Sequence, residues 1–307
     1  MFVVKYRKIF FALSIALIVV SAYGFFTYGL KYSIDFKGGT ITELAYDKTL
    51  PAQSVLEDGI KTMDIGTFSV RGTIREDGGR GYIIRTRELN EAERADLILK
   101  TTAEGGVAPK VVRSNTIGPV AGEELKAKAV KAIAVVVLMI VLFITFAFRR
   151  VSKPVSSWKY GLATVIALAH DVIIPTGIFA FLGHLQGMEV DLLFVTGLLA
   201  ILGYSVHDTI VVFDRVRENL KINRDTSKKE DFEETVGKSV AQTFGRSINT
   251  SLTIFITLMA LHLYGGESTR EFSLLLIIGV IVGTYSSIFV ASPLLVTFQK
   301  WQKKSDK

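Results

Sequence analysis

Hydrophobic residues gather in six long stretches that are separated by polar segments. Each stretch holds about 20 largely apolar residues, the length that an α-helix needs to cross a hydrocarbon core of about 30 Å. We therefore predict six membrane-spanning helices. Their ranges are Ile9–Leu30, Lys128–Phe148, Tyr160–Leu182, Val190–Phe213, Thr243–Tyr264 and Phe272–Phe298.

The segment between the first two predicted helices, Lys31–Leu125, has a different pattern. Short runs suited to strands alternate with two helical stretches, in the order strand, helix, strand, strand, helix, strand. This order predicts a ferredoxin-like α+β domain, whose two helices cover one face of an antiparallel sheet. The predicted strands are Ile34–Ala45, Thr67–Ile74, Gly81–Thr86 and Pro109–Ile117, and the helices are Pro51–Met63 and Asn90–Thr102.

Two residues within this segment have predicted local roles. Asn90 is expected to cap the second helix, because its side chain accepts hydrogen bonds from the first backbone N–H groups. The pair Gly38 and Gly39 is expected to bend or bulge the first strand.

Composition agrees with a membrane protein rather than a soluble enzyme. The chain has 307 residues, of which 49% are hydrophobic and 21% charged, and its mean hydropathy is +0.39. The predicted division is residues 1–30 as an N-terminal tail and first helix, 31–125 as the α+β domain, and 126–307 as helices two to six with their loops and a C-terminal tail. The chain has no cysteine, which excludes disulfides and cysteine metal sites.

The net charge is +7, so nucleic acid has to be considered as a partner. Basic residues gather before the first helix, between helices two and three, between helices four and five, and after helix six. The short connections on the opposite side, Gly183–Glu189 and Gly265–Glu271, have Arg270 as their only Lys or Arg. This asymmetry predicts cytoplasmic termini, an extracytoplasmic Lys31–Leu125 domain and a membrane-bound chain that does not bind nucleic acid.

The fourth apolar stretch contains two ionisable residues, His207 and Asp208. An ionised Asp near a helix centre costs roughly 2.5–3.5 kcal/mol on insertion scales, so such residues normally face a bundle interior and serve ion or proton movement. Ser205 and Thr209 share a helix face with Asp208, and Tyr204 lies four residues before it. The fourth helix therefore has a polar face.

The fifth stretch carries a polar stripe of Arg246, Asn249, Thr250 and Thr253 at helical spacing. We expect this stripe to face Asp208, with Arg246 stabilising its charged form while burial favours its neutral form. The predicted proton relay comprises Asp208, His207 and these four residues. In the alternative interpretation, Asp208 is a structural carboxylate locked to Arg246.

The third stretch holds a second pair of polar residues, His170 and Asp171. They form a possible secondary proton site, or they only hydrogen-bond to neighbouring helices, as polar side chains in membranes often do. We find no nucleotide-binding loop, metal-ligand set or hydrolase triad, so neither a cofactor, a metal nor enzymatic activity is predicted.

Six motifs together resemble the SecF members of the SecD/SecF family. The first two flank the α+β domain, and the other four lie on the third to sixth helices in order. They are Ile34-Asp-Phe-Lys-Gly-Gly-Thr40, Gly118-Pro119 with Gly122-Glu-Glu-Leu125, His170-Asp171, Gly203 to Asn219, Arg246-Ser-Ile-Asn-Thr-Ser251 and Gly283-Thr-Tyr-Ser-Ser-Ile288.

The resemblance implies one six-span half of a resistance-nodulation-division bundle, with SecD as the other half. It further implies the SecYEG channel, YidC, membrane lipid and translocating secretory polypeptides as partners, in the bacterial cytoplasmic membrane. The expected function is use of the proton motive force to promote protein export. The alternatives are an architectural translocon subunit that moves no protons and a small-molecule or lipid exporter of the same superfamily.

Overall fold

The computed structural model describes residues 2–46, 50–74, 79–102, 108–149, 155–227 and 230–305. Six of the helices in these ranges are long and apolar enough to cross a membrane, which confirms the predicted number. The first five are α2 (Arg7–Tyr28), α6 (Pro119–Ala147), α7 (Ser157–Gln186), α8 (Leu192–Asp225) and α9 (Phe232–Tyr264). The sixth is a continuous run of α10 (Glu267–Ser286), η1 (Ser287–Ala291) and α11 (Ser292–Ser305), and a short α1 (Phe2–Lys5) precedes α2.

Helices α8 and α9 extend well beyond the predicted ends at Phe213 and Thr243. The prediction was wrong there because a helix does not end where its apolar run ends. The added turns are amphipathic: Val216 of α8 and Val236 of α9 are both fully buried in the same hydrophobic cluster. Polar contacts join the same turns, including Asn219 Nδ2 to Ser239 Oγ at 2.8 Å.

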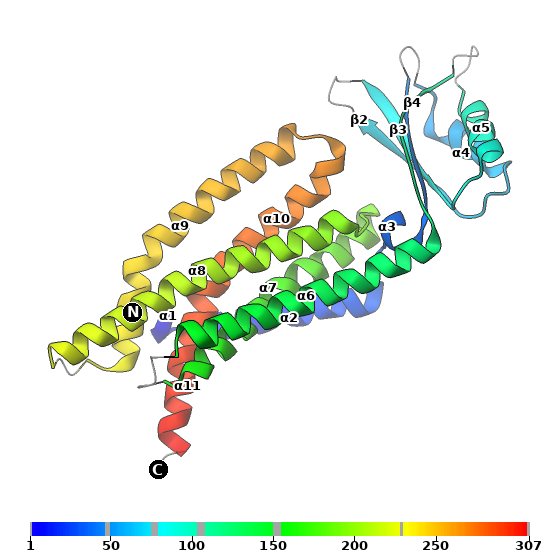
Figure 1. Cartoon of the computed structure of the whole chain (residues 1–307). Coiled ribbons are helices and arrows are strands. Elements are labelled where there is room, and N and C mark those ends of the chain that lie inside the picture. Colours follow the sequence, from blue (N-terminus) through cyan, green and yellow to red (C-terminus); the bar gives the residue numbers. More distant parts are fainter. Residues whose placement is uncertain are drawn as a thin grey trace.

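The segment between α2 and α6 forms the predicted ferredoxin-like unit. Its four strands are β1 (Gly39–Ala45), β2 (Ser69–Ile74), β3 (Arg80–Thr86) and β4 (Lys110–Ile117), and its helices are α4 (Gln53–Lys61) and α5 (Glu91–Lys100). The sheet is antiparallel with the order β2-β3-β1-β4, and α4 and α5 cover one face (Figure 1). As predicted, Asn90 caps α5, accepting from Glu93 N at 2.9 Å in a capping box.

The start of this unit differs from the prediction. Residues Ile34–Lys37 form a short helix, α3, instead of the first half of a strand, and Ser33 caps it by accepting from Asp35 N at 3.2 Å. Gly38 ends α3 at φ 77° and Gly39 opens β1 at φ 134°, so the glycine pair separates a helix from a strand instead of bulging one strand. Only glycine adopts such angles without strain.

The α+β unit is tied to the helical bundle by the loop between α7 and α8. Tyr32 and Val190 form a parallel β-bridge, with Ser33 N donating to Val190 O at 2.9 Å and Val190 N donating to Lys31 O at 2.6 Å. Both chain termini lie at the opposite end of the bundle from the sheet (Figure 1).

Candidate functional site

Polar side chains from four helical segments meet inside the bundle. We call this group the polar centre: His170 and Asp171 of α7; Tyr204, Ser205, Asp208 and Thr209 of α8; Ser247 and Ser251 of α9; and Thr284, Ser286 and Ser287 at the junction of α10 and η1. All of them except Tyr204 are buried. Because water is absent from the core of a membrane, each group must find its partners within the protein.

Asp171 is fully buried and accepts hydrogen bonds at both carboxylate oxygens. Its Oδ1 lies 2.9 Å from His170 Nδ1, and its Oδ2 accepts from the hydroxyl of Ser205 and, at 2.7 Å, from that of Ser286. This carboxylate therefore joins α7 to both α8 and α10. The contacts agree with a role in holding helices together, and they leave the predicted proton role open.

His170 has one satisfied and one unsatisfied ring nitrogen. Nδ1 faces Asp171, whereas Nε2 is buried and has no hydrogen-bond partner among the described residues. The ring stacks on Tyr285, with centroids 5.9 Å apart and planes 18° apart. A buried nitrogen without a partner is costly in structural terms, which makes it a candidate for function.

Asp208 has a much poorer set of partners. Its side chain is 7% exposed; Oδ1 accepts from Ser247 Oγ at 2.5 Å, whereas Oδ2 is buried and no hydrogen bond to it is found in the described part of the chain. Next to it, Thr209 Oγ1 lies 2.9 Å from Ser287 Oγ. The two buried carboxylates of the polar centre thus differ in the number of donors that surround them.

The polar stripe predicted on α9 does not face α8 within this chain. Arg246, Asn249, Thr250 and Thr253 are all exposed, and so is His207 of α8. The side chains that reach α8 are those of Ser247 and Ser251, one of which bonds to Asp208 and the other to Tyr204 at 2.5 Å. The expected contact between Arg246 and Asp208 is therefore wrong for the isolated chain.

A physical reason explains this error. Helix α9 has polar residues on two faces, and periodicity alone does not say which face packs inward. The Ser247 and Ser251 spacing of four residues was the available signal, but serine is small and close to neutral on hydropathy scales. The more polar stripe with Arg246 was therefore the more visible one.

The sixth membrane-spanning run contributes two consecutive serines to the polar centre. They lie where the α-helix α10 gives way to the π-helical turn η1. Ser286 is the last residue of α10, and Ser287 is the first of η1, a π-helical turn. Both are fully buried. Single π-turns within α-helices occur frequently at functional sites. Here the turn accompanies two neighbouring hydroxyls that bond to two different helices.

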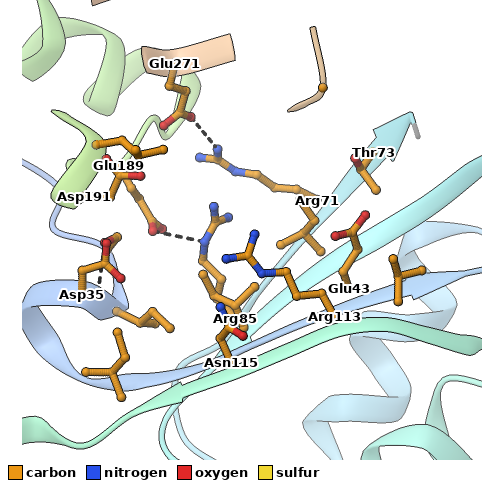
Figure 2. Close-up of a pocket in the computed structure, with 18 of the residues that line it drawn as sticks. Asp35, Glu43, Arg71, Thr73, Arg85, Arg113, Asn115, Glu189, Asp191 and Glu271 are labelled. Carbon is orange, nitrogen blue, oxygen red and sulfur yellow. Dashed lines mark hydrogen bonds and ion pairs between the residues drawn. The ribbon is translucent and has the colours of Figure 1, made fainter. Parts of the chain in front are cut away.

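A second charged region lies between the open face of the sheet and the adjoining ends of α8 and α10 (Figure 2). It is a cleft of about 650 Å³ that has arginines on three strands and carboxylates mainly on the helix side. Arg85 Nε of β3 lies 3.1 Å from Glu189, and Arg71 Nη1 of β2 lies 3.6 Å from Glu271. This region was not predicted from the sequence, because its residues come from segments far apart in the chain.

Asp191 belongs to the same cleft and caps α8. Its Oδ1 accepts from Phe194 N at 2.8 Å. Burial raises the pKa of Asp191 above its usual value, and the nearby charge of Asp35 acts in the same direction. The carboxyl therefore binds a proton more readily in the folded protein than in the unfolded chain.

These features define a polytopic membrane protein with buried carboxylates inside its helical bundle and a ferredoxin-like domain at one end. Residues 98–301 match the family described as Protein export membrane protein SecD/SecF, C-terminal, and residues 23–50 match the SecD/SecF GG Motif. The chain belongs to the SecD/SecF family.

Individual relatives agree with this assignment. The protein translocase subunit SecF of Thermobaculum terrenum is 39% identical, over 98% of this chain and 94% of the relative. SecF of Anaerolinea thermophila is 37% identical, over 98% and 96% of the two chains. Within the family, the chain thus corresponds to the SecF subunit of protein translocase.

The fold is also that of a solved relative. A crystal structure of SecDF from Thermus thermophilus, described as a translocon-associated membrane protein, matches with a TM-score of 0.80 and 31% identity. The match covers 98% of this chain but only 38% of that chain. The super-membrane-facing form of SecDF matches less closely, with a TM-score of 0.68.

Proposed function

We propose that this chain acts with SecD to use the proton motive force for the translocation and release of secretory proteins across the bacterial cytoplasmic membrane. Asp208 is the observation that carries this proposal. One of its oxygens has the Ser247 hydroxyl as a donor, and the other is buried without a partner among the described residues. An ionised carboxylate in that position would lack solvation, so the site favours uptake of a proton.

The exposed stripe on α9 supports a partner subunit. Arg246, Asn249 and Thr250 are too polar to face lipid without cost, and they lie on an outer face of the bundle. The SecDF relative is longer than this chain, which spans 38% of it. We infer that SecD covers this face, and that Arg246, Asn249, Thr250, Thr253 and His207 complete the relay around Asp208 from the interface.

The proposed orientation follows from the basic loops. Both termini lie at the end of the bundle opposite the sheet, and the basic residues of the sequence gather in the connections at that end. The positive-inside rule then assigns the termini to the cytoplasm and the domain of residues 31–125 to the outer side. In that orientation the domain meets secretory polypeptides as they leave the SecYEG channel, with YidC and membrane lipid as further neighbours.

The energy of one proton limits the mechanism. At a membrane potential of about 150 mV, one charge that crosses the membrane supplies roughly 3.5 kcal/mol. Moving a two-state equilibrium from 1:99 to 99:1 requires about 5.5 kcal/mol. One proton driven by potential alone therefore shifts the conformational equilibrium without completing the change, so a pH gradient or a second proton contributes the remainder.

Maturation of precursor proteins tests the proposal. Cells depleted of their own SecF receive this chain with its matching SecD, either as wild type or as Asp208→Asn, at equal membrane abundance. The substitution keeps the size and the bond from Ser247 but removes the titratable proton. We expect wild type to restore export and Asp208→Asn to fail.

The matched control is Asp225→Asn, an acidic residue at the exposed end of the same helix. It is expected to restore export as wild type does. Equal export by wild type and Asp208→Asn would contradict the relay and favour an architectural subunit. Loss of export in the Asp225 control would instead indicate a general effect of changes in α8.

A further inference from the structure

We propose that Asp171, paired with His170, is a second proton-binding carboxylate, and that the hydroxyls of Ser205, Ser286 and Ser287 connect its surroundings to the part of α8 that carries Asp208. This inference rests on the proposed function and extends it from one proton site to two. The only bonds that form or break are O–H and N–H bonds, as a proton moves onto or off the pair.

Interhelical contact alone needs only a hydroxyl or an amide, which is neutral at all pH values. Here a carboxylate lies fully buried in the bundle beside an imidazole, at a distance of 2.9 Å that allows a proton to pass between Oδ1 and Nδ1. The pair therefore holds a proton at either atom.

The Nε2 atom of His170 is buried without a partner among the described residues. If His170 is neutral with its proton on Nδ1, Nε2 is a buried acceptor without a donor; if it is charged, Nε2 is a buried donor without an acceptor. Nε2 is therefore left without a partner in either state within the described chain. A buried polar atom of this kind is a candidate for a functional role.

Hydrogen bonds connect Asp171 to the part of α8 that carries Asp208. Ser205 lies three residues before Asp208 on α8, and its hydroxyl donates to Asp171 Oδ2. Ser286 donates to the same oxygen at 2.7 Å, and the neighbouring Ser287 donates to the Ser205 carbonyl at 3.2 Å. Ser287 also lies 2.9 Å from the Thr209 hydroxyl, next to Asp208 in the chain.

In this arrangement, the protonation of Asp171 affects the protonation of Asp208. Asp171 is bonded by hydroxyls of α8 and α10, and Asp208 lies three residues after the bonded Ser205 on α8, in an interior where charges interact strongly. A negative charge at Asp171 favours proton uptake at Asp208, because two ionised carboxylates in one buried centre repel each other. Two groups that interact in this way titrate as a pair and not as separate residues.

The surroundings add few other titratable groups. His170 lies on α7 itself, Asp208 and Tyr204 come from α8, and Tyr285 comes from α10. The packed faces of α2 and α6 contribute no acidic or basic side chain from Ile9 to Tyr28 or from Ala132 to Ala147. Arg246 of α9 is exposed on the outer side. The titration of Asp171 therefore depends chiefly on His170 and Asp208.

Infrared difference spectroscopy of the purified complex with SecD tests this inference. The carbonyl band of protonated carboxyl groups is recorded against pH for wild type, Asp171→Asn and Asp208→Asn. Asparagine keeps the bonds from Ser205 and Ser286 but cannot titrate. We expect Asp171→Asn to remove one titrating band and to shift the midpoint of the Asp208 band by about one pH unit, with the reciprocal shift in Asp208→Asn.

A second variant tests the inference even if Asp171→Asn fails to fold. Ser286→Ala retains both carboxyl groups but removes one donor from Asp171, and it is expected to move the Asp171 midpoint to higher pH because the charged form loses a hydrogen bond. The control Asp225→Asn should leave both midpoints unchanged. An Asp208 midpoint that is the same in wild type and Asp171→Asn, or the absence of any titrating band that Asp171→Asn removes, overturns the inference.

These outcomes are separate from those of the export assay. If Asp208→Asn restores export but the two carboxyl bands shift together, the proposed proton-driven function fails and the coupled pair stands. If Asp208→Asn abolishes export but the bands titrate independently, the function stands and the coupled pair fails.

Discussion

Ser286 and Ser287 are neighbours in the chain, yet their hydroxyls bond to different helices: Ser286 donates to Asp171 of α7, and Ser287 pairs with Thr209 of α8. In a regular α-helix, consecutive side chains point about 100° apart. At this position the π-helical turn of η1 begins at Ser287, and both side chains are fully buried. The sixth span therefore connects α7 and α8 through two adjacent residues.

This relationship predicts the effect of removing one hydroxyl. Ser287→Ala should lower the free energy of unfolding by about 1–3 kcal/mol, because Thr209 Oγ1 loses a buried partner. Thermal unfolding of the purified protein in detergent measures the change. The control is Thr253→Ala, whose exposed hydroxyl donates to the Asn249 carbonyl of its own helix at 2.9 Å. An equal decrease in the free energy of unfolding in both variants would contradict the role of Ser287 in connecting the sixth span to α8.

The glycine pair before β1 allows a second prediction. Gly38 has φ 77°, and a Cβ atom there would lie 2.7 Å from the backbone Cα of Pro119, at the start of α6. Gly38→Ala should therefore cost more than the roughly 1–3 kcal/mol of the strained positive-φ conformation alone. It should also weaken the contact between α3 and α6. Unfolding in detergent and limited proteolysis near Pro119 measure both effects.

Gly66 is the matched control for this change. Its φ of 75° is nearly the same, but a Cβ atom there would meet nothing within 4 Å. Gly66→Ala should thus cost the conformational strain only. If both alanine variants lose the same stability, close approach to Pro119 is not what requires glycine at position 38.

The ion pair across the cleft gives a third prediction. Arg85 and Glu189 each have 19% of the side chain exposed, so their attraction is only partly screened by water. A double-mutant cycle with Arg85→Met and Glu189→Gln should give a coupling energy of about 1 kcal/mol that decreases at high salt. The largely exposed pair Asp58 and Lys61 should give a smaller coupling energy. A coupling near zero for Arg85 and Glu189 would show that the domain does not depend on this contact.

Asp191 predicts a dependence on pH. Because burial raises its pKa in the folded protein, the folded state holds this proton more tightly than the unfolded chain does. Its contribution to stability is therefore greatest below the unfolded pKa of about 3.9 and is lost as the pH rises through the folded pKa. Asp191→Asn keeps the cap on α8 without the charge, so it should raise the unfolding temperature at neutral pH and have little effect below pH 4.

The pH profile of the unfolding temperature measures this effect. Asp225→Asn, at the exposed end of α8, serves as the control and should leave the profile unchanged. A stabilisation by Asp191→Asn that is larger at acid than at neutral pH would contradict the sign of the shift.

The sequence predicted the architecture more fully than the site. The length of the apolar stretches predicted the six spans, and the order of the short strand and helix segments predicted the ferredoxin-like unit. Both features depend on the local pattern of the sequence. Asp208 and Asp171 stood out because a carboxylate is costly in a membrane. The inward face of α9 was not predictable in this way, since Ser247 gives a weaker signal than the Arg246 beside it.

The cleft between the sheet and the bundle was not predictable from the sequence, for a different reason. Arg71 and Arg85 look like ordinary outward residues of alternating strands, and Glu271 looks like a charge at a helix end. Only the packing of the sheet against the bundle brings them together. Likewise, nothing local at Ser286 indicates a π-helical turn.

The bridge between Tyr32 and Val190 has a mechanical consequence. Val190 lies two residues before α8, so the sheet is attached almost directly to one end of a helix of 34 residues. At 1.5 Å per residue, this helix is a rod about 51 Å long. It carries Asp208 near its middle and the contact of Asn223 with Thr235 near its far end. Under the proposed function, a displacement of this helix that starts at the carboxyl group would reach both of its ends together, without any flexible linker between them.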